Sequence, residues 1–197
     1  MKLNWAERWA VNNPLRPIQV QLELDWLKRN ARLKPYAHVL EVGCGRGAGS
    51  SLIKTMFEPA VLHAMDLDVE MIRKAFRYLS VEQREGISFF VSDAVLLPYP
   101  DEAMDAVFGF GVLHHVPDWQ RGLAEIARVL KPGGIYFFEE LYPPLYQNFL
   151  TRHILLHPIK NRFCSQDLKL ALKNAGLEQG NFLEHKRLGI LGFASKR

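Results

Sequence analysis

From residue 38 onward, the hydrophobic positions alternate between two kinds of spacing. Short apolar runs, typical of buried strands, are separated by longer segments in which apolar residues recur every three or four positions, as on one face of a helix. This alternation predicts parallel strands joined by right-handed helical crossovers, and hence a doubly wound sheet. The predicted strands are His38–Val42, Val61–Met65, Ile87–Val91, Ala106–Phe110 and Ile135–Glu139, and the predicted helices are Ala48–Phe57, Val69–Tyr78 and Leu123–Leu130.

The region before residue 37 is helical in pattern. Pro14 and Pro17 interrupt its start, and beyond them apolar residues recur at the spacing of one helix face. We therefore expect an amphipathic helix that gives residues 1–36 the character of a helical cap. The residues that define its expected apolar face are Ile18, Leu22, Trp26 and Leu27.

The rhythm changes after the fifth predicted strand. Residues 141–158 are rich in aromatic residues, proline and histidine, and predict an insertion or a helix with irregular ends. A helix follows, with Ser165 as its expected N-cap and Gly176 at its end. Two further strands, near Leu177–His185 and Gly189–Ser195, are expected to form an antiparallel edge hairpin. The expected fold class is thus α/β: a doubly wound, Rossmann-like sheet, mostly parallel, with this C-terminal hairpin and the N-terminal helical cap.

Composition and charge narrow the class of protein. The chain of 197 residues is 48% hydrophobic and 23% charged, which is typical of a folded globular protein. Two cysteines, no signal-peptide pattern and no apolar run of membrane-spanning length lead us to expect a cytoplasmic protein. Residues 1–36 carry seven Lys or Arg against three Asp or Glu, and residues 150–197 carry nine against three. Because no dense basic run stands out, we favour a solvated surface over a contact with phosphates or anionic lipid.

The segment VLEVGCGRG, Val39–Gly47, predicts a ligand site. A buried strand runs into a turn with glycine at every second position, and glycine permits both a positive φ and the close approach of another molecule. Open α/β sheets bind ligands at the carboxyl ends of their strands. Gly43, Gly45 and Ala48 also fit the G-x-G-x-x-[GA] pattern of dinucleotide-binding domains, so that alternative stays open.

Carboxylates follow the next two predicted strands. Asp66 ends the second strand, where a carboxylate can accept hydrogen bonds from both hydroxyls of a ribose, whereas Asp68 is the better candidate for a helix cap. Asp93 and Ala94 follow the third strand. There a carboxylate can accept from an exocyclic amine while the next backbone N–H meets a ring nitrogen. These residues predict an adenosine lying across the strand ends.

Taken in order, these motifs resemble the class I S-adenosylmethionine-dependent methyltransferases, in their small-molecule, type 11-like branch. The resemblance spans roughly residues 37–140. One departure is Arg46, where the family commonly has a small residue. The matching blocks are Val39–Gly47, Met65–Asp68, Asp93–Ala94 with Leu97–Asp101, and Val129–Gly134.

The resemblance implies a role for each matching position. Glu41 and the backbone around Gly43, Cys44, Gly45 and Gly47 would hold the methionine portion of S-adenosylmethionine. Asp66 would bind the ribose, Leu67 would pack on the adenine, and Asp93 with Ala94 would bind its edge. Phe110 and Gly111 would lie beside the methyl group that is transferred.

The sequence gives fewer signals for the residues that would contact the methyl acceptor. His115 matches a histidine that recurs in the small-molecule branch, and it is our candidate for a general base if the nucleophile arrives protonated. The alternatives are a pocket-lining role and a hydrogen bond that shapes the loop. His153 and His157 lack a third ligand, so no metal is expected. The candidate pocket residues are His114, Trp5, Trp9, Tyr142 and Tyr146.

We therefore expect methyl transfer to an O, N or C nucleophile of a small molecule by in-line displacement. We expect one domain, with a cofactor-binding core over 37–140 and a substrate-side insertion and hairpin over 141–197. No stable nucleic-acid partner is expected, and the sequence specifies no oligomeric state. The alternatives are an RNA or protein acceptor and a cofactor-binding protein without transferase activity. Asp93–Ala94 and Lys131–Gly134 disfavour a nicotinamide dehydrogenase.

Overall fold

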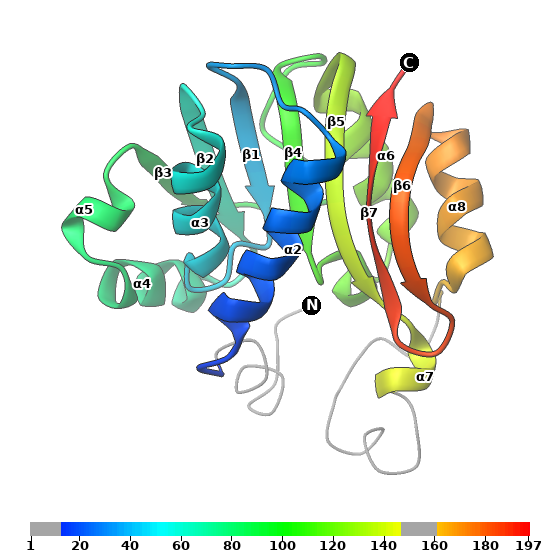
Figure 1. Ribbon diagram of the computed structural model, residues 1–197, viewed down its shortest axis with the longest axis horizontal. Coiled ribbons are helices and arrows are strands. Elements are labelled where there is room, and N and C mark those ends of the chain that lie inside the picture. Colours follow the sequence, from blue (N-terminus) through cyan, green and yellow to red (C-terminus); the bar gives the residue numbers. More distant parts are fainter. Residues whose placement is uncertain (1–12, 147–160) are drawn as a thin grey trace.

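A seven-stranded sheet forms the centre of the protein, in a computed structural model that describes residues 13–146 and 161–197 (Figure 1). The strand order is β3-β2-β1-β4-β5-β7-β6. Strands β1 to β5 pair in parallel, and β7 pairs antiparallel with both β5 and β6. The expected fold class is confirmed. The strands are β1 His38–Val42, β2 Val61–Asp66, β3 Ile87–Val91, β4 Met104–Phe110, β5 Leu130–Leu141, β6 Leu177–His185 and β7 Gly189–Lys196.

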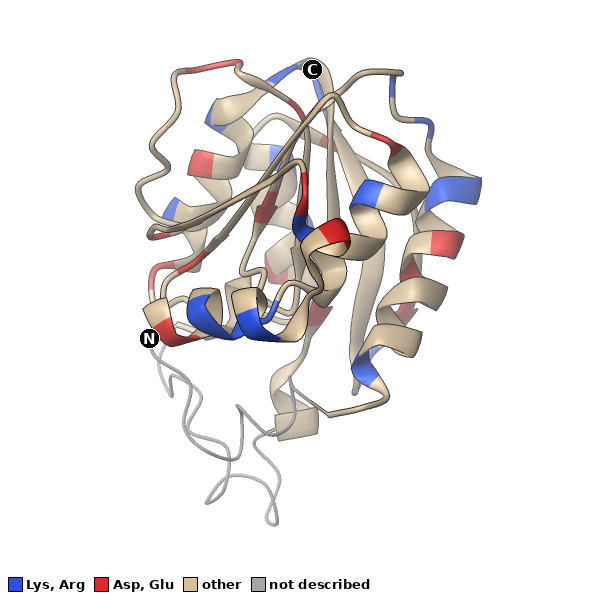
Figure 2. Ribbon diagram, turned by 90° about the vertical axis from the view of Figure 1, so that its left-hand side faces the viewer, with Lys and Arg blue, Asp and Glu red and all other residues tan. Residues whose placement is uncertain are grey.

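Helices lie on both faces of the sheet (Figures 1 and 2). Their hydrophobic stripes are buried against the strands, which is what stabilises a layered α/β fold. None of the helices in the described part of the chain is both long and apolar enough to cross a membrane. The helices are α2 Arg16–Asn30, α3 Ala48–Phe57, α4 Val69–Tyr78, α5 Val81–Arg84, the 3-10 helix η1 Leu113–His115, α6 Trp119–Val129, α7 Pro143–Tyr146 and α8 Ser165–Asn174.

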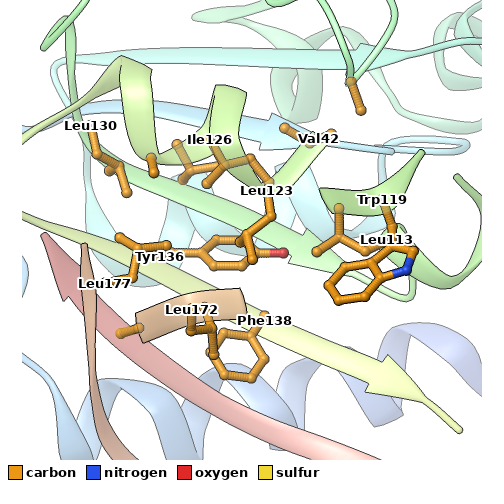
Figure 3. Packing of buried hydrophobic residues seen from close by; sticks show 14 of the residues in the cluster. Val42, Leu113, Trp119, Leu123, Ile126, Leu130, Tyr136, Phe138, Leu172 and Leu177 are labelled. Carbon is orange, nitrogen blue, oxygen red and sulfur yellow. The ribbon is translucent and has the colours of Figure 1, made fainter. Parts of the chain in front are cut away.

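Alternate side chains of β5 enter two different cores. Phe137 packs with Phe108 of β4 and with α2 and α3 on one face. Tyr136 and Phe138 point to the other face, where they meet side chains of α6 and α8 (Figure 3). A strand buried on both faces has this continuous apolar character because neither face meets water. The two cores fix the carboxyl ends of the parallel strands relative to one another.

The buried face of α2 differs from the expectation. Val20, Leu24 and Leu27 are buried against the sheet, whereas Ile18 and Leu22 are 57% and 64% exposed. Apolar residues occur on more than one face of this helix, and the sheet contacts the face with Val20 and Leu24. The predicted inward orientation of Ile18 and Leu22 is therefore wrong, although the helix itself is present.

The boundaries of α6, β5 and α8 also differ from the expectation. Helix α6 begins at Trp119 because the side chain of Asp118 accepts a hydrogen bond from the backbone N–H of Arg121, and it ends before Leu130, which pairs with Met104 of β4. The residues Lys131–Gly134 then bulge out of β5, between Leu130 and the pairing of Ile135 with Ala106. Helix α8 is capped by Cys164, so the predicted N-cap Ser165 is instead its first helical residue.

Candidate cofactor site

A cavity of about 430 Å³ lies at the carboxyl ends of the parallel strands, the edge to which the arrowheads of β1 and β4 point in Figure 1. Its walls come from five separate stretches of sequence. The loops after β1, β2, β3 and β4 each contribute, and α2 closes one side. The lining comprises residues 41–46, 48–49, 65–67, 92–95, 110–112 and 115–118, together with Arg16 and Val20.

The glycine turn after β1 brings bare backbone to the cavity. Gly43 and Gly45 have φ angles of 72° and 55°, a region that glycine enters at little cost. A Cβ on Gly43 would lie 2.5 Å from Cγ2 of Val112, and beside Gly45 there is open space. Gly47 has no place in the cavity lining: it caps α3, and a Cβ there would meet Leu79. The structure thus places Gly47 outside the cavity lining, and its predicted contact with the methionine portion stays a prediction.

Asp66 reaches directly under the glycine turn. Its Oδ2 accepts a hydrogen bond from the backbone N–H of Gly45 at 3.0 Å, and its Oδ1 accepts one from that of Asp68 at 2.8 Å. Each carboxylate oxygen keeps a second lone pair for a ligand hydroxyl. Burial raises the pKa of Asp66. Asp68 caps α4 as expected, through a hydrogen bond from the backbone N–H of Glu70.

Asp93 and Ala94 form the wall beside Asp66. The loop after β3 is attached to β2 by a hydrogen bond from the Ser92 N–H to the Asp66 carbonyl oxygen, 3.2 Å long. Asp93 is exposed and its Oδ1 accepts from the N–H of Val95, whereas Ala94 is buried. Leu67, 39% exposed, also borders the cavity. The structure therefore brings together all four residues that were predicted to surround an adenosine.

Glu41 is a buried carboxylate in the floor of the cavity. The hydroxyl of Ser50 in α3 donates a hydrogen bond to it. Loss of hydration raises the pKa of Glu41 to about 7, and the charge of Asp66 contributes in the same direction. Cys44 lines the same region as a free, buried thiol whose pKa is raised above its usual range by burial. A thiol in this state is a weak nucleophile, and we assign it a packing role.

Arg16 is a cavity residue that the sequence did not reveal. It extends from α2 to Glu139 at the end of β5, with 3.3 Å between Nη2 and Oε2, and its Nη1 lies 3.9 Å from Glu23. Burial, followed by the nearby charge of Glu139, raises the pKa of Glu23 to about 7. The three groups join the end of α2 to the sheet. No sequence motif marks this group, because Arg16 and Glu139 are 123 residues apart in the sequence.

The two histidines after β4 have different positions. His115 lines the cavity, as do Phe110 and Gly111. His114 is buried away from it, and its Nδ1 lies 2.7 Å from Oε2 of Glu140. Glu140 also accepts hydrogen bonds from three successive backbone N–H groups at the start of η1, so this carboxylate fixes the loop that carries His115.

The other predicted pocket residues are not found in the cavity wall. Tyr142 and Tyr146 are almost fully buried, and the hydroxyl of Tyr142 donates a hydrogen bond to Glu184. His114, whose ring stacks on that of Tyr146, is likewise absent from the lining, so the structure does not place these three residues in the described cavity wall. Trp5 and Trp9 lie outside the described residues. In the described ranges, no group of three His, Cys, Asp or Glu side chains is arranged to hold a metal ion.

Comparison with known proteins agrees with this geometry. The sequence model of a family described as "Methyltransferase domain" matches residues 40–138, half of the chain. The chain therefore belongs to this methyltransferase family. Family membership decides against the nicotinamide dehydrogenase.

The curated relatives that match are longer proteins. A fatty-acid O-methyltransferase of Mycolicibacterium smegmatis is 38% identical over 105 residues, covering 53% of this chain and 37% of the relative. A phthiotriol/phenolphthiotriol dimycocerosates methyltransferase of Mycobacterium ulcerans is 37% identical over 152 residues, covering 72% of this chain and 53% of the relative. The chain thus matches about half or less of their length.

Solved structures share the fold at low sequence identity. A SAM-dependent methyltransferase from Aquifex aeolicus has a TM-score of 0.72 and 20% identity, with 100% of both chains covered. A Haloferax volcanii methyltransferase, in complex with the Trm112 methyltransferase activator, has a TM-score of 0.75 and 22% identity, covering 93% of this chain and 80% of that one.

Proposed function

We propose that this protein binds S-adenosylmethionine in the cavity and transfers its methyl group to a small lipophilic acceptor. One observation carries the cofactor assignment: Asp66, Asp93 and the bare turn at Gly43 and Gly45 meet in a single cavity. Asp66 offers two oxygens for the ribose hydroxyls, and Asp93 with Ala94 offers an acceptor and a backbone donor for the adenine edge. The glycine turn leaves room for the methionine portion against the main chain.

The residues at the methionine end supply position more than chemistry. A bound sulfonium carries an already activated methyl group, so the protein must align the acceptor and exclude water. Phe110 and Gly111 occupy the end of β4 from which an acceptor would approach. Hydrogen bonds from the backbone of η1 to Glu140 hold this end of the cavity in place. Among the described residues that line the cavity, the histidine is His115. We assign it the removal of a proton from an alcohol-type acceptor.

A lipophilic acceptor is supported by the names of the relatives and by the lining. Two of the curated relatives act on fatty acids and phthiotriol dimycocerosates according to their names. Beyond Gly111 the cavity wall here includes Val20, Val112, Val116 and Pro117, an apolar surface suited to an alkyl chain. The name of the fatty-acid O-methyltransferase implies that an oxygen atom of the acceptor is the nucleophile.

RNA or protein acceptors remain the alternative class. Lys and Arg are distributed among Asp and Glu over helices and loops, without one continuous basic stripe in the part of the chain that is described (Figure 2). Phosphate-backbone binding relies on such a stripe. The charge distribution therefore favours a small molecule.

Calorimetric titration with S-adenosylhomocysteine tests the cofactor assignment. We expect micromolar binding, weakened at least about tenfold by Asp66→Ala and by Asp93→Ala, because each change removes hydrogen bonds to the nucleoside. Arg73→Ala, on the exposed side of α4, serves as a control. If both aspartate variants bind as tightly as the wild type, the residue assignments are wrong.

Transfer of a labelled methyl group tests the acceptor class. Fatty acids, long-chain alcohols and phenols are offered in parallel with bulk tRNA and with a mixture of unmodified proteins. Labelled lipid extractable into organic solvent supports the proposal. Label found only in RNA or protein, or tight cofactor binding with no transfer to any acceptor in the panel, contradicts it.

A further inference from the structure

Arg46 is the residue of the glycine turn for which the family resemblance gives no role. It lines the cavity between Gly45 and α3. Its guanidinium lies over the ring of Tyr78 at the end of α4, 4.1 Å from the ring centre, and its Nη2 donates a hydrogen bond to the carbonyl oxygen of Asn13, 3.1 Å long. Two segments that are distant in sequence from Arg46 therefore hold its guanidinium at the cavity.

No acidic residue in the described part of the chain compensates the charge of Arg46. Among the described residues no carboxylate forms an ion pair with it, and its Nε is buried without a hydrogen-bond partner. Arg16, the other arginine of the cavity, differs because it is paired with Glu139 and lies near Glu23. A half-buried guanidinium without an acidic partner attracts an anionic group, and its planar donor fork suits a carboxylate.

We propose that Arg46 forms a subsite for a ligand carboxylate at the cavity, an inference that rests on the proposed function. Two ligands of that function can bring a carboxylate: the methionine portion of the cofactor and an acidic acceptor such as a fatty acid. The other charged groups of the lining are Glu41, Asp66, Asp93 and Asp118, which repel an anion, and the paired Arg16. Among the described lining residues, Arg46 is therefore the one that can bind the negatively charged group of a ligand.

Calorimetry with two matched ligands tests this subsite on the whole chain. S-Adenosylhomocysteine carries the carboxylate, and its decarboxylated analogue keeps the adenosine, the thioether and the ammonium group. We expect Arg46→Gln to weaken S-adenosylhomocysteine binding about 10- to 100-fold, since hydrogen bonds to charged groups have this strength, and to change binding of the analogue by less than about twofold. Arg46→Lys retains the charge and should give a smaller loss.

Arg84→Gln is the matched control. Arg84 also lies over an aromatic ring, that of Phe76 at 5.3 Å, but it takes no part in the cavity lining. This variant should bind both ligands as the wild type does. Thermal unfolding of each variant without ligand identifies any general loss of structure.

A second titration distinguishes the two sources of the carboxylate. Dodecanoate is added to protein saturated with S-adenosylhomocysteine. If Arg46→Gln weakens dodecanoate binding about tenfold while S-adenosylhomocysteine binding is unchanged, the subsite belongs to the acceptor. The proposal is overturned if neither carboxylate ligand is affected, or if the decarboxylated analogue weakens equally, because Arg46 would then only shape the loop. Failure of the wild type to bind either adenosine ligand would instead overturn the proposed function.

Discussion

Glu41 shows how a single residue can link the sheet to the cavity. Its side chain is 3% exposed, accepts a hydrogen bond from Ser50 and occupies the space in which a Cβ of Gly49 would stand. The start of α3 can therefore approach β1 only because position 49 is glycine. This contact places a carboxylate of raised pKa beneath the bare turn at Gly43 and Gly45.

The raised pKa of Glu41 predicts a pH-dependent stability. Its pKa rises from 4.5 to about 7 on folding, so the folded state holds this proton more tightly than the unfolded state does. The stabilisation is complete below pH 4.5 and is lost as pH rises through 7. Glu41→Gln, which is neutral at every pH, should therefore be more stable than the wild type at pH 8 by about 1–3 kcal/mol.

Urea unfolding of the ligand-free protein, repeated between pH 4.5 and pH 8, checks this prediction. The difference between variant and wild type should shrink toward zero at the acidic end. A difference that stays constant across this range would show that Glu41 is not protonated in the folded protein near neutral pH.

Gly43 predicts a second effect at the scale of a residue. With φ at 72° and Cγ2 of Val112 2.5 Å from the position of a Cβ, Gly43→Ala adds both backbone strain and overpacking. We expect a loss of about 2–4 kcal/mol in the free energy of unfolding. Gly45→Ala meets only the backbone strain, since its Cβ would enter open space, and should lose about 1–2 kcal/mol.

Chemical denaturation of the two variants measures that difference. The double variant Gly43→Ala with Val112→Ala should be less destabilised than the sum of its single changes, because the added methyl group then has room. Equal losses for Gly43→Ala and Gly45→Ala would contradict the close approach of η1 to the glycine turn.

At the scale of the element, α2 illustrates how tertiary contacts choose among apolar faces. Its residues Ile18 and Leu22 follow a helical spacing but are exposed, whereas Val20 and Leu24 enter the core together with Leu27, which was on the predicted face. Both faces are apolar in sequence, and the position of Arg16 against Glu139 agrees with only one rotation of the helix. The ion pair between Arg16 and Glu139 thus forms in the same orientation of α2 that buries Val20 and Leu24.

A pair of truncations tests the rotation of α2. Leu24→Ala removes a side chain that is 0% exposed and should lower the free energy of unfolding by about 2–5 kcal/mol through the cavity it leaves. Leu22→Ala changes a side chain that is 64% exposed and should stay within about 0.5 kcal/mol of the wild type. Guanidinium unfolding compares the two, and the reverse order of losses would mean that α2 presents its other face to the sheet.

The 3-10 helix η1 is the other element that the cavity needs. Its first backbone N–H groups point at Glu140, which is fully buried and also bonds to His114. An anion at the start of a helical turn satisfies donors that have no partner within the helix. The consequence is that His115, the next residue, is carried to the cavity wall while His114 is turned into the interior.

At the scale of the whole molecule, the sequence predicted most of the architecture. Strands β1 and β3 and helices α3 and α4 have the expected bounds, because each combines a clear periodicity with a Gly, Pro or Asp close to one of its ends. The ends of β5 and α6 were missed, since the bulge at Lys131–Gly134 depends on pairing with β4. The local pattern of apolar residues indicates the periodicity of an element, whereas the register of a strand is set by the strand that pairs with it.

The cavity itself was predicted in part. Residues at strand ends, such as Asp66 and Asp93, could be found because parallel strands bring their carboxyl ends to one edge of the sheet. Arg16 and Glu139 could not, since only the packing of α2 on the sheet brings them together. Tyr142 and Tyr146, which were predicted to line the pocket, lie outside the described cavity wall, because the path of the chain beyond a strand is not encoded in its periodicity.

The sequence by itself therefore determined the class of fold, the strand ends that form the cavity and the family, because spacing, glycine turns and carboxylates after strands are local properties of the chain. The tertiary structure decided which face of α2 is buried, which of two adjacent histidines lines the cavity and which arginine there has no ion pair with a described carboxylate. Those outcomes depend on contacts between residues far apart in sequence, whose energies exist only once the layers have packed.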